Sequence, residues 1–390
     1  MDLTRIISEC QTIAELSTLL ESSSFNEFER QFFLKREYEI ESRLEKWKKE
    51  NQQFGLWANI TNSWTPEQRQ QLLSDWNNDR GLSHNELEIR KSIEHRQKIE
   101  ELEALESGKL EKGLGPIKRF SARKSFTLGS GSSGTFVYVG ILQDGSEVAI
   151  KRMLIQACED TAENERKILS LINTKKSPFI VSYRHFLMDN TFMYLILDLC
   201  EKTLDKYVCS LSTDHLQRHG RKMIKDIFAG LAFLHGEGIL HRDLKPKNVL
   251  VDVGGCMKLA DFGISRVLNQ EETTFHTDAK GTSGWMPAEV IKHLNEQLKY
   301  PSKGRYKRKS DVQVAGMLSF FILSKGEHPF GATVYEQMGN IVNGNPVNLR
   351  MLAEGDARRF VSWLIQHNLD ARPNADDALK HDFLDDEEFI

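Results

Sequence analysis

Residues 241–248 read His-Arg-Asp-Leu-Lys-Pro-Lys-Asn, with Asp243 and Asn248 five positions apart. A carboxylate at the first of these positions can accept the proton of an attacking hydroxyl, and an amide oxygen at the second can hold a magnesium ion on phosphate groups. The alternative is a polar turn between two strands. Four further motifs lie in order around this stretch, which favours an active-site loop for phosphoryl transfer over a turn.

A glycine-rich segment, Gly129–Gly134, precedes this loop with the pattern G-x-G-x-x-G, whose backbone amides can approach nucleotide phosphates. A dinucleotide-binding loop has the same pattern but opens a helix within a parallel βαβ unit, which would indicate a dehydrogenase. Here the glycines lead into the apolar run Phe136–Val139, a hairpin turn at Asp144, and a strand that ends Val-Ala-Ile-Lys at Lys151. The flanks therefore predict a β-hairpin over a nucleotide, with the Lys151 ammonium on its phosphates.

A lone lysine at this place would be mobile, so it needs a carboxylate to orient it. The helical stretch Cys158–Ile172 offers Glu165, which precedes an apolar pair and can point inward while that pair packs. Glu163 is the alternative partner on the same helix, and an ordinary surface position is the other interpretation of Glu165. We predict that Glu165 orients Lys151.

A second candidate metal ligand, Asp261, begins the tripeptide Asp-Phe-Gly, thirteen residues after Asn248 at the end of an expected hairpin. Its carboxylate would bind the magnesium that bridges the β and γ phosphates. The polar loop Ile264–Met286 follows, and Arg242 could pair with a phosphate added to it. Solvated hydroxyls are the ordinary interpretation of this loop, and the predicted phosphorylation sites are one or two of Thr273, Thr274 and Thr277.

Further residues are expected to support the site. Lys245 and Thr282 fit a loop that receives a serine or threonine substrate. At residues 286–289 the chain reads Met-Pro-Ala-Glu, where the motif A-P-E has its first two residues in the other order. Glu289 remains, and Arg372 is its predicted buried partner. Asp311, near the start of a helix, is expected to brace the backbone of the catalytic loop.

The N-terminal residues 1–112 are charged and predicted to be helical. A capping box at Ser83 to Glu86 opens a helix that could extend to about Ser107. A partner-binding or dimerising region is one interpretation, and a helical domain packed on itself or on the following residues is the other. The irregular apolar repeat favours the second. Residues 113–118 are predicted to be a linker.

Composition excludes several classes of protein. The chain has 390 residues and a net charge of −4, which argues against a nucleic-acid-binding protein. Its longest apolar run, near Val314–Leu323, is too short to span a membrane, and the N-terminus lacks a secretory pattern. Five scattered cysteines argue against a disulfide framework or a zinc site. We predict a soluble cytoplasmic protein without a membrane span, and a nuclear location remains open.

From about residue 118 to its end, the chain resembles eukaryotic protein kinases. It is most similar to the kinase half of the unfolded-protein-response sensors, the inositol-requiring kinase/endoribonucleases, and of ribonuclease L. The resemblance rests on Leu128–Gly140 with Lys151, on the catalytic loop, and on residues 199–208, 230–235, 281–285 and 325–331. It implies an α+β bilobal kinase fold within residues 119–390. The small β-rich lobe would be 119–199 and the large helical lobe 200–390, after an N-terminal α-helical extension.

The sequence departs from that family in three respects. No residues remain after the kinase segment for a ribonuclease domain, so RNA cleavage is not expected, and neither a lumenal domain nor a membrane span is expected. Phe136 stands where we expect the valine that other kinases place over adenine, which would narrow the nucleotide pocket. The exchanged residues before Glu289 affect the substrate-binding segment rather than the magnesium site.

We therefore expect an ATP- and Mg²⁺-dependent serine/threonine protein kinase that acts on proteins and on its own activation loop, for which a homodimer would serve. The alternative is a nucleotide-sensing scaffold or dimerisation module with little phosphotransfer. The catalytic residues would be Asp243, Lys245, Lys151 and Glu165, and the metal ligands Asn248 and Asp261. The nucleotide would contact Leu128, Gly129, Ser130, Gly131, Ser132, Ser133, Gly134, Thr135, Phe136, Lys151, Asp198, Cys200 and Leu250.

Overall fold

The computed structural model describes residues 91–111, 114–131, 134–172, 177–268, 275–277, 281–297 and 304–385. The chain divides into two compact units, Met1–Lys91 and Ser92–Ile390. The expectations for the first unit, including the capping box at Ser83, lie outside the described residues. Everything below concerns the second unit.

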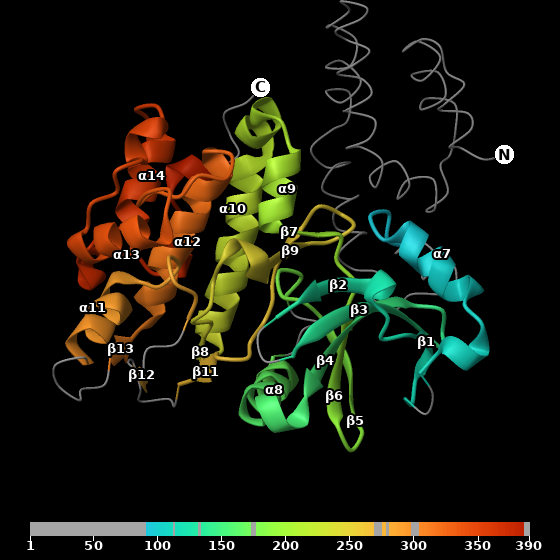
Figure 1. The fold of residues 1–390 in the computed structure, drawn as a ribbon. Helices are drawn as coiled ribbons and strands as arrows, with labels where there is room; N and C mark the ends of the chain where they lie inside the picture. Colours follow the sequence, from blue (N-terminus) through green and yellow to red (C-terminus); the bar gives the residue numbers. More distant parts are fainter. Residues whose placement is uncertain are drawn as a thin grey trace, which may run out of the picture. The chain divides into compact units, whose positions relative to one another are not determined.

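The N-terminal part of this unit is built on an antiparallel six-stranded sheet with the order β1-β3-β4-β6-β5, in which β2 pairs with β3 (Figure 1). Runs of consecutive apolar residues in β3 and β4 bury side chains on both faces of this sheet. The strands are β1 (Ile117–Phe120), β2 (Thr127–Ser130), β3 (Phe136–Leu142), β4 (Glu147–Leu154), β5 (Tyr183–Met188) and β6 (Phe192–Asp198).

Two helices pack against this sheet. Helix α8 (Ile155–Leu171) follows β4 directly and contacts β4, β5 and β6. Helix α7 (Arg96–Ala104) contacts β1 and β3 and buries Ile99 and Leu102 completely. The compact unit begins at Ser92, and β1 begins at Ile117, within residues 113–118.

The C-terminal part is mainly helical (Figure 1). Ser212 caps the long helix α10 by accepting a hydrogen bond from His215 N, and α12 is apolar on all sides and almost entirely buried. The helices are α9 (Leu204–Ser210), α10 (Thr213–Gly236), α11 (Ala288–Gln297), α12 (Arg308–Leu323), α13 (Val334–Asn343), α14 (Asp356–Leu364) and α15 (Ala375–Ala378). Short pairings join β7 (Lys202–Thr203), β9 (Val249–Val251) and β10 (Met257–Leu259), then β8 (Ile239–Leu240) with β11 (Arg266–Val267), and β12 (Phe275–Thr277) with β13 (Gly304–Tyr306). This order of a β-rich part before a helical part is the expected bilobal fold.

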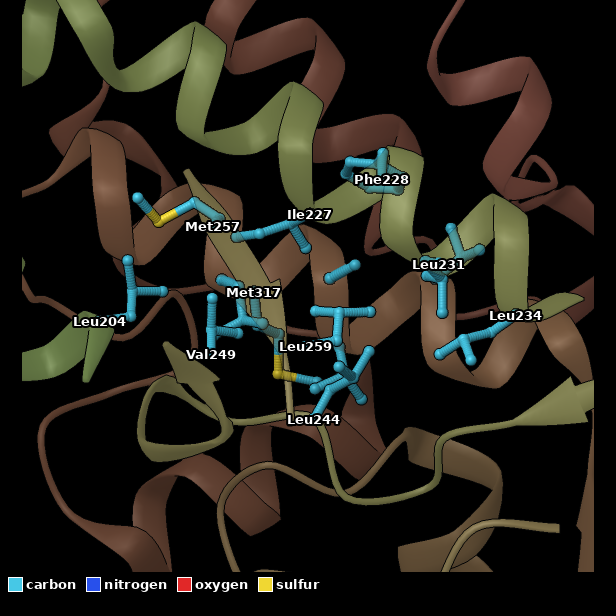
Figure 2. Packing of buried hydrophobic residues seen from close by; sticks show 14 of the residues in the cluster. Leu204, Ile227, Phe228, Leu231, Leu234, Leu244, Val249, Met257, Leu259 and Met317 are labelled. Atoms are coloured by element: carbon cyan, nitrogen blue, oxygen red, sulfur yellow. The ribbon is translucent and has the colours of Figure 1, made fainter. Parts of the chain in front are cut away.

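The hydrophobic core places the loop at residues 241–248. Apolar side chains of α10, α12, β9 and β10 pack together in this region (Figure 2). Leu244, from the middle of the loop, is 1% exposed and belongs to the same cluster. Because Leu244 is buried, its polar neighbours Asp243 and Lys245 are held at a defined place on the surface of the core.

Candidate active site

A buried aspartate positions the backbone of the catalytic loop. Asp311, at the start of α12, is fully buried and accepts hydrogen bonds from the backbone amides of His241 and Arg242, each at 3.0 Å. The Tyr306 hydroxyl donates to it at 2.5 Å. Arg242 has a φ of 69°, which is unfavourable for a residue with a Cβ, so these bonds offset a local strain. The expectation that Asp311 braces this backbone is confirmed.

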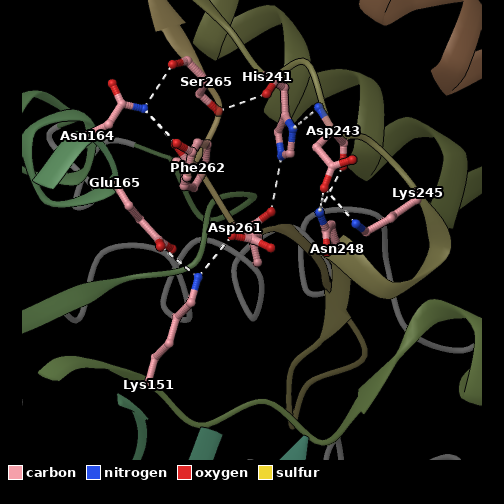
Figure 3. Close-up of polar contacts among 12 residues, drawn as sticks. Lys151, Asn164, Glu165, His241, Asp243, Lys245, Asn248, Asp261, Phe262 and Ser265 are labelled. Atoms are coloured by element: carbon pink, nitrogen blue, oxygen red, sulfur yellow. Dashed lines mark hydrogen bonds and ion pairs between the residues drawn. The ribbon is translucent and has the colours of Figure 1, made fainter. Parts of the chain in front are cut away.

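Lys151 lies between two carboxylates from distant parts of the chain. Its Nζ atom is 2.6 Å from Glu165 Oε2 on α8 and 2.9 Å from Asp261 Oδ1 (Figure 3). Glu163, the other candidate on α8, pairs instead with Arg166. One helical turn is 3.6 residues, so two positions along α8 change the direction of a side chain by about 200°. The structure therefore brings Lys151, Glu165 and Asp261 together.

The electrostatics of this group favour the charged forms of Lys151 and Asp261. Burial opposes the charge of Lys151, but Asp261 and Glu165 raise the pKa of its ammonium well above the usual value. The charge of Lys151 lowers the pKa of Asp261 to about 2, so this carboxylate is ionised at neutral pH. Burial raises the pKa of Glu165, whose side chain is 2% exposed. Lys151 thus compensates the cost of burying Glu165 and keeps Asp261 anionic.

Asn164 joins α8 to the segment that follows Asp261, and the sequence analysis missed it. Its Nδ2 atom donates to the backbone carbonyls of Phe262 at 3.2 Å, Gly263 at 3.0 Å and Ser265 at 3.0 Å (Figure 3). An asparagine beside a glutamate on a helix gives no signal in the sequence, because its partners are main-chain atoms about one hundred residues away. The contacts hold Asp261 in register with Lys151.

A second group of polar side chains surrounds Asp243. Lys245 Nζ lies 2.6 Å from Asp243 Oδ2 and 2.7 Å from Thr282 Oγ1, and the Thr282 hydroxyl donates to Asp243 Oδ1 at 2.8 Å. Asn248 Nδ2 donates to the carbonyl and to the carboxylate of Asp243 at 2.8 and 3.0 Å. Asp243 thus has a hydroxyl, an ammonium and an amide around it, as a base that accepts a proton from a hydroxyl requires.

The donor set fits a magnesium ion. The Asn248 amide nitrogen is bound to Asp243, which leaves the amide oxygen for a cation. Asp261 uses one carboxylate oxygen for Lys151, and its side chain is 43% exposed, so the other oxygen is accessible. Hard oxygen donors of this kind suit Mg²⁺. Within the described residues, no cluster of three His, Cys, Asp or Glu side chains offers another metal site.

The register of β3 corrects the interpretation of Phe136. Val137 pairs with Lys151, and Phe136 pairs with Arg152. Paired residues share a face of the sheet, so Val137 lies on the Lys151 face and Phe136 on the other, where it is 42% exposed near Tyr138. This register does not favour the predicted contact of Phe136 with the nucleotide, and it makes Val137 the candidate for that place. A one-residue difference in register moves a side chain to the opposite face.

Other residues predicted to contact the nucleotide are two partly buried leucines and the glycine-rich turn. Leu128 and Leu250 are partly buried and pack against the main core cluster that contains Ala149, the next residue on the Lys151 face. Gly131 N donates to Thr135 O at 2.8 Å and closes the glycine-rich turn, whereas Ser132 and Ser133 lie outside the described residues. The remaining predicted contacts of this turn are Gly129, Ser130 and Gly134, of which Gly129 and Ser130 end β2.

Asp198 and Cys200 lie where the chain passes from the sheet to the helical part. The Asp198 carboxylate is 2.5 Å from Arg184 Nε, so that side chain is engaged within the sheet. Cys200 is 9% exposed, and burial raises the pKa of its thiol. The Asp198 side chain is paired with Arg184, and the Cys200 side chain is buried. A nucleotide would therefore meet the backbone of this connection.

The loop after Asp261 is described in part. Thr273 and Thr274 lie outside the described residues, and Thr277 ends β12, which pairs with β13. Arg242 Nη1 donates to Ile264 O at 3.0 Å, and its guanidinium lies 5.7 Å from the centre of the Tyr306 ring. The phosphorylation sites therefore stay a prediction.

The expected ion pair between Glu289 and Arg372 lies directly after the loop Ile264–Met286. Arg372, with a side chain that is fully buried, lies 3.1 and 3.0 Å from the two carboxylate oxygens of Glu289. It also donates to the carbonyls of Gln366, His367 and Lys309. The exchange of Pro287 and Ala288 leaves this buried pair intact, and the prediction of the pair is confirmed.

An antiparallel sheet precedes a helical part, a lysine is held by two acids, and an aspartate in the loop 241–248 lies beside a lysine and an asparagine. This arrangement is that of a protein kinase. Residues 123–384 match the family described as "Protein kinase domain", and the chain belongs to that family. The family generally uses ATP with Mg²⁺ and has protein substrates. Among the helices that the structure describes, none has both the length and the apolar character to cross a bilayer.

Within this family, the chain is similar to several curated kinase/endoribonucleases. The chain is 34% identical over 287 residues to the serine/threonine-protein kinase/endoribonuclease IRE1 of Oryza sativa, covering 66% of this chain and 30% of that protein. It is 30% identical over 279 residues to the human kinase/endoribonuclease IRE2, covering 69% of this chain and 29% of the relative. The Caenorhabditis elegans protein ire-1 is 32% identical, with 66% and 26% covered. The chain thus spans less than a third of the length of these relatives, within their kinase region.

Proposed function

We propose that this chain transfers the γ-phosphoryl group of ATP, in the presence of Mg²⁺, to serine and threonine hydroxyls of proteins, including its own activation loop. Asp243 would orient the acceptor hydroxyl and receive its proton, and Lys245 would offset charge that develops on the transferred group. Lys151 would hold the phosphates, oriented by Glu165. Asn248 and Asp261 would hold the metal, which supplies electrostatic neutralisation of the phosphate oxygens when bound.

The contact that carries this proposal is the Thr282 hydroxyl between Asp243 and Lys245. It donates to Asp243 Oδ1 at 2.8 Å and accepts from Lys245 Nζ at 2.7 Å. A substrate hydroxyl needs the same pair of contacts, a carboxylate that takes its proton and a cation near the oxygen that forms the new bond. A threonine hydroxyl already lies within reach of both groups, which supports an alcohol acceptor.

The test uses the full chain, Mg²⁺, γ-labelled ATP and peptides that present Ser, Thr or Tyr. We expect label on Ser and Thr peptides and on the chain itself. Asp243→Asn and Lys151→Met should reduce transfer at least about a thousandfold, because residues that act together on one transition state lose most of the rate singly. Lys167→Met is the matched control, since Lys167 is an exposed lysine of α8 whose ion pair, within the part of the chain that the structure describes, is with Glu163.

Normal transfer by Asp243→Asn would overturn the proposed role of that residue. ATP binding without transfer by the wild-type chain would favour the nucleotide-sensing scaffold instead. Transfer within one chain can be distinguished from transfer between two copies. When an inactive Lys151→Met chain is mixed with the active chain, mass spectrometry should find phosphate on the inactive chain. Label confined to the active chain would contradict transfer between two copies.

A further inference from the structure

The segment before α7 is bound by two acidic side chains, Glu147 at the start of β4 and Glu201 in the connection after β6. Ser92 N donates to Glu147 Oε2 at 2.7 Å, and Arg96 forms an ion pair with the same carboxylate. The amides of Ile93 and Glu94 both donate to Glu201 Oε2, at 3.0 and 2.7 Å.

Glu201 places this contact at the nucleotide side of the molecule. It follows Cys200 directly, in the connection between the sheet and the helical part. Lys202 Nζ, one residue further, lies 3.2 Å from Glu94 Oε2. The start of α7 is therefore bound to the connection whose backbone a nucleotide would meet.

His95 reaches the backbone of the same connection. Its Nε2 atom is 3.1 Å from the carbonyl oxygen of Cys200. A carbonyl only accepts, so the imidazole carries its proton on Nε2 in this contact. Burial lowers the pKa of the ring, which keeps it neutral near pH 7. One side chain thus holds the peptide group that follows Cys200.

Apolar packing joins the same helix to the other edge of the nucleotide site. Ile99 and Leu102 form a small buried cluster with Phe126, Val139 and Ile141. Leu128, the last residue before the glycine-rich segment, and Leu199, which precedes Cys200, both pack against this cluster. Helix α7 therefore contacts residues on both sides of the place proposed for the purine.

We propose that Ser92–Ala104 is a brace that sets the distance between Leu128 and the Leu199–Lys202 connection, and that His95 is a positioning residue for the adenine nucleotide. This inference rests on the proposed function. The brace links the N-terminal unit covalently to the nucleotide site, so a partner that pulls Ser92–Arg96 away from Glu201 would weaken nucleotide binding.

The experiment compares His95→Ala, His95→Gln and Gln97→Ala in the full chain. Glutamine places an amide N–H near the position of Nε2 and should restore the bond. Gln97 is exposed and bonds to Glu101 on the same helix, so its variant is the control. Four quantities are measured: the Kd of Mg-ADP by calorimetry, the KM and the kcat for ATP in transfer, and the melting temperature without nucleotide.

We expect His95→Ala to raise the Kd of Mg-ADP about fivefold, the equivalent of one neutral hydrogen bond. KM should rise in parallel, with kcat and the melting temperature close to wild type, and His95→Gln should recover most of the affinity. An unchanged Kd in His95→Ala would overturn the inference. The inference would also be overturned if His95→Ala lowered both the affinity and the melting temperature and His95→Gln restored neither. A wild-type chain that binds Mg-ADP but transfers no phosphate would refute the proposed function and leave the Kd test of the brace valid.

Discussion

The bonds from Asn164 allow a quantitative prediction, because an isosteric substitution removes them. Asn164→Asp keeps the shape of the side chain and replaces both amide protons by a second oxygen. Three backbone carbonyls, of Phe262, Gly263 and Ser265, then face a carboxylate. Each lost bond costs about 1 kcal/mol net, and repulsion between oxygens adds to this. The conformation that places Asp261 beside Lys151 should therefore become less stable by about 2–3 kcal/mol.

This loss should appear as weaker binding of the metal nucleotide. When a binding-competent state becomes less populated, the apparent Kd rises by the same factor. A loss of 2–3 kcal/mol corresponds to a factor of about 30 to 150 at most. Calorimetric titration with Mg-ADP measures the effect, and titration with ADP in excess chelator measures the metal-independent part. We expect the increase in Kd mainly in the presence of Mg²⁺, since Asp261 is the proposed ligand.

Two further variants separate the causes. Asn164→Ala removes the bonds without adding charge and should fall between wild type and Asn164→Asp. Asn343→Asp makes the same chemical change at an exposed position at the end of α13 and should bind like wild type. A Kd of Asn164→Asp within about twofold of wild type would refute the coupling of α8 to Asp261.

Three more predictions follow from the packing. Arg372→Met should lower the free energy of unfolding by about 3–5 kcal/mol in urea titrations, because the Glu289 carboxylate and several carbonyls lose their buried partner; a change below about 1 kcal/mol would contradict this. Burial lowers the pKa of His328 to about 4, so the unfolded chain binds the proton first and stability should fall from about pH 6.5 to 4. His328→Phe should remove up to about 3 kcal/mol of this loss of unfolding free energy between pH 6.5 and 4, as measured by melting at several pH values. An unchanged pH dependence would contradict the role of His328. Val137→Ala should weaken Mg-ADP binding, whereas Phe136→Ala should alter the Kd less than about twofold; the reverse order would show that the register of β3 is misassigned.

Adjacent residues could be identified from the sequence because their chemistry depends on spacing along the chain. The catalytic loop, the Asp-Phe-Gly tripeptide and the strand that ends at Lys151 are contiguous motifs, and they predicted both the class of protein and the bilobal fold. Asp311 and Arg372 were also predicted, since each belongs to a short motif with one expected partner. For Asp311 and Arg372 the motif identified the residue, and the tertiary structure brings it to a partner 70 or 83 residues away.

The tertiary structure decided what depends on the direction of a side chain or on packing between distant segments. The pairing of β3 with β4 places Val137, not Phe136, on the Lys151 face, and one residue of slip would reverse this. The rotation of α8 selects Glu165 over Glu163 and directs Asn164 to the backbone after Asp261. Helix α7 joins the kinase unit because Ile99 and Leu102 find an apolar surface on β3. Such choices depend on contacts between residues far apart in the chain, which local spacing does not encode.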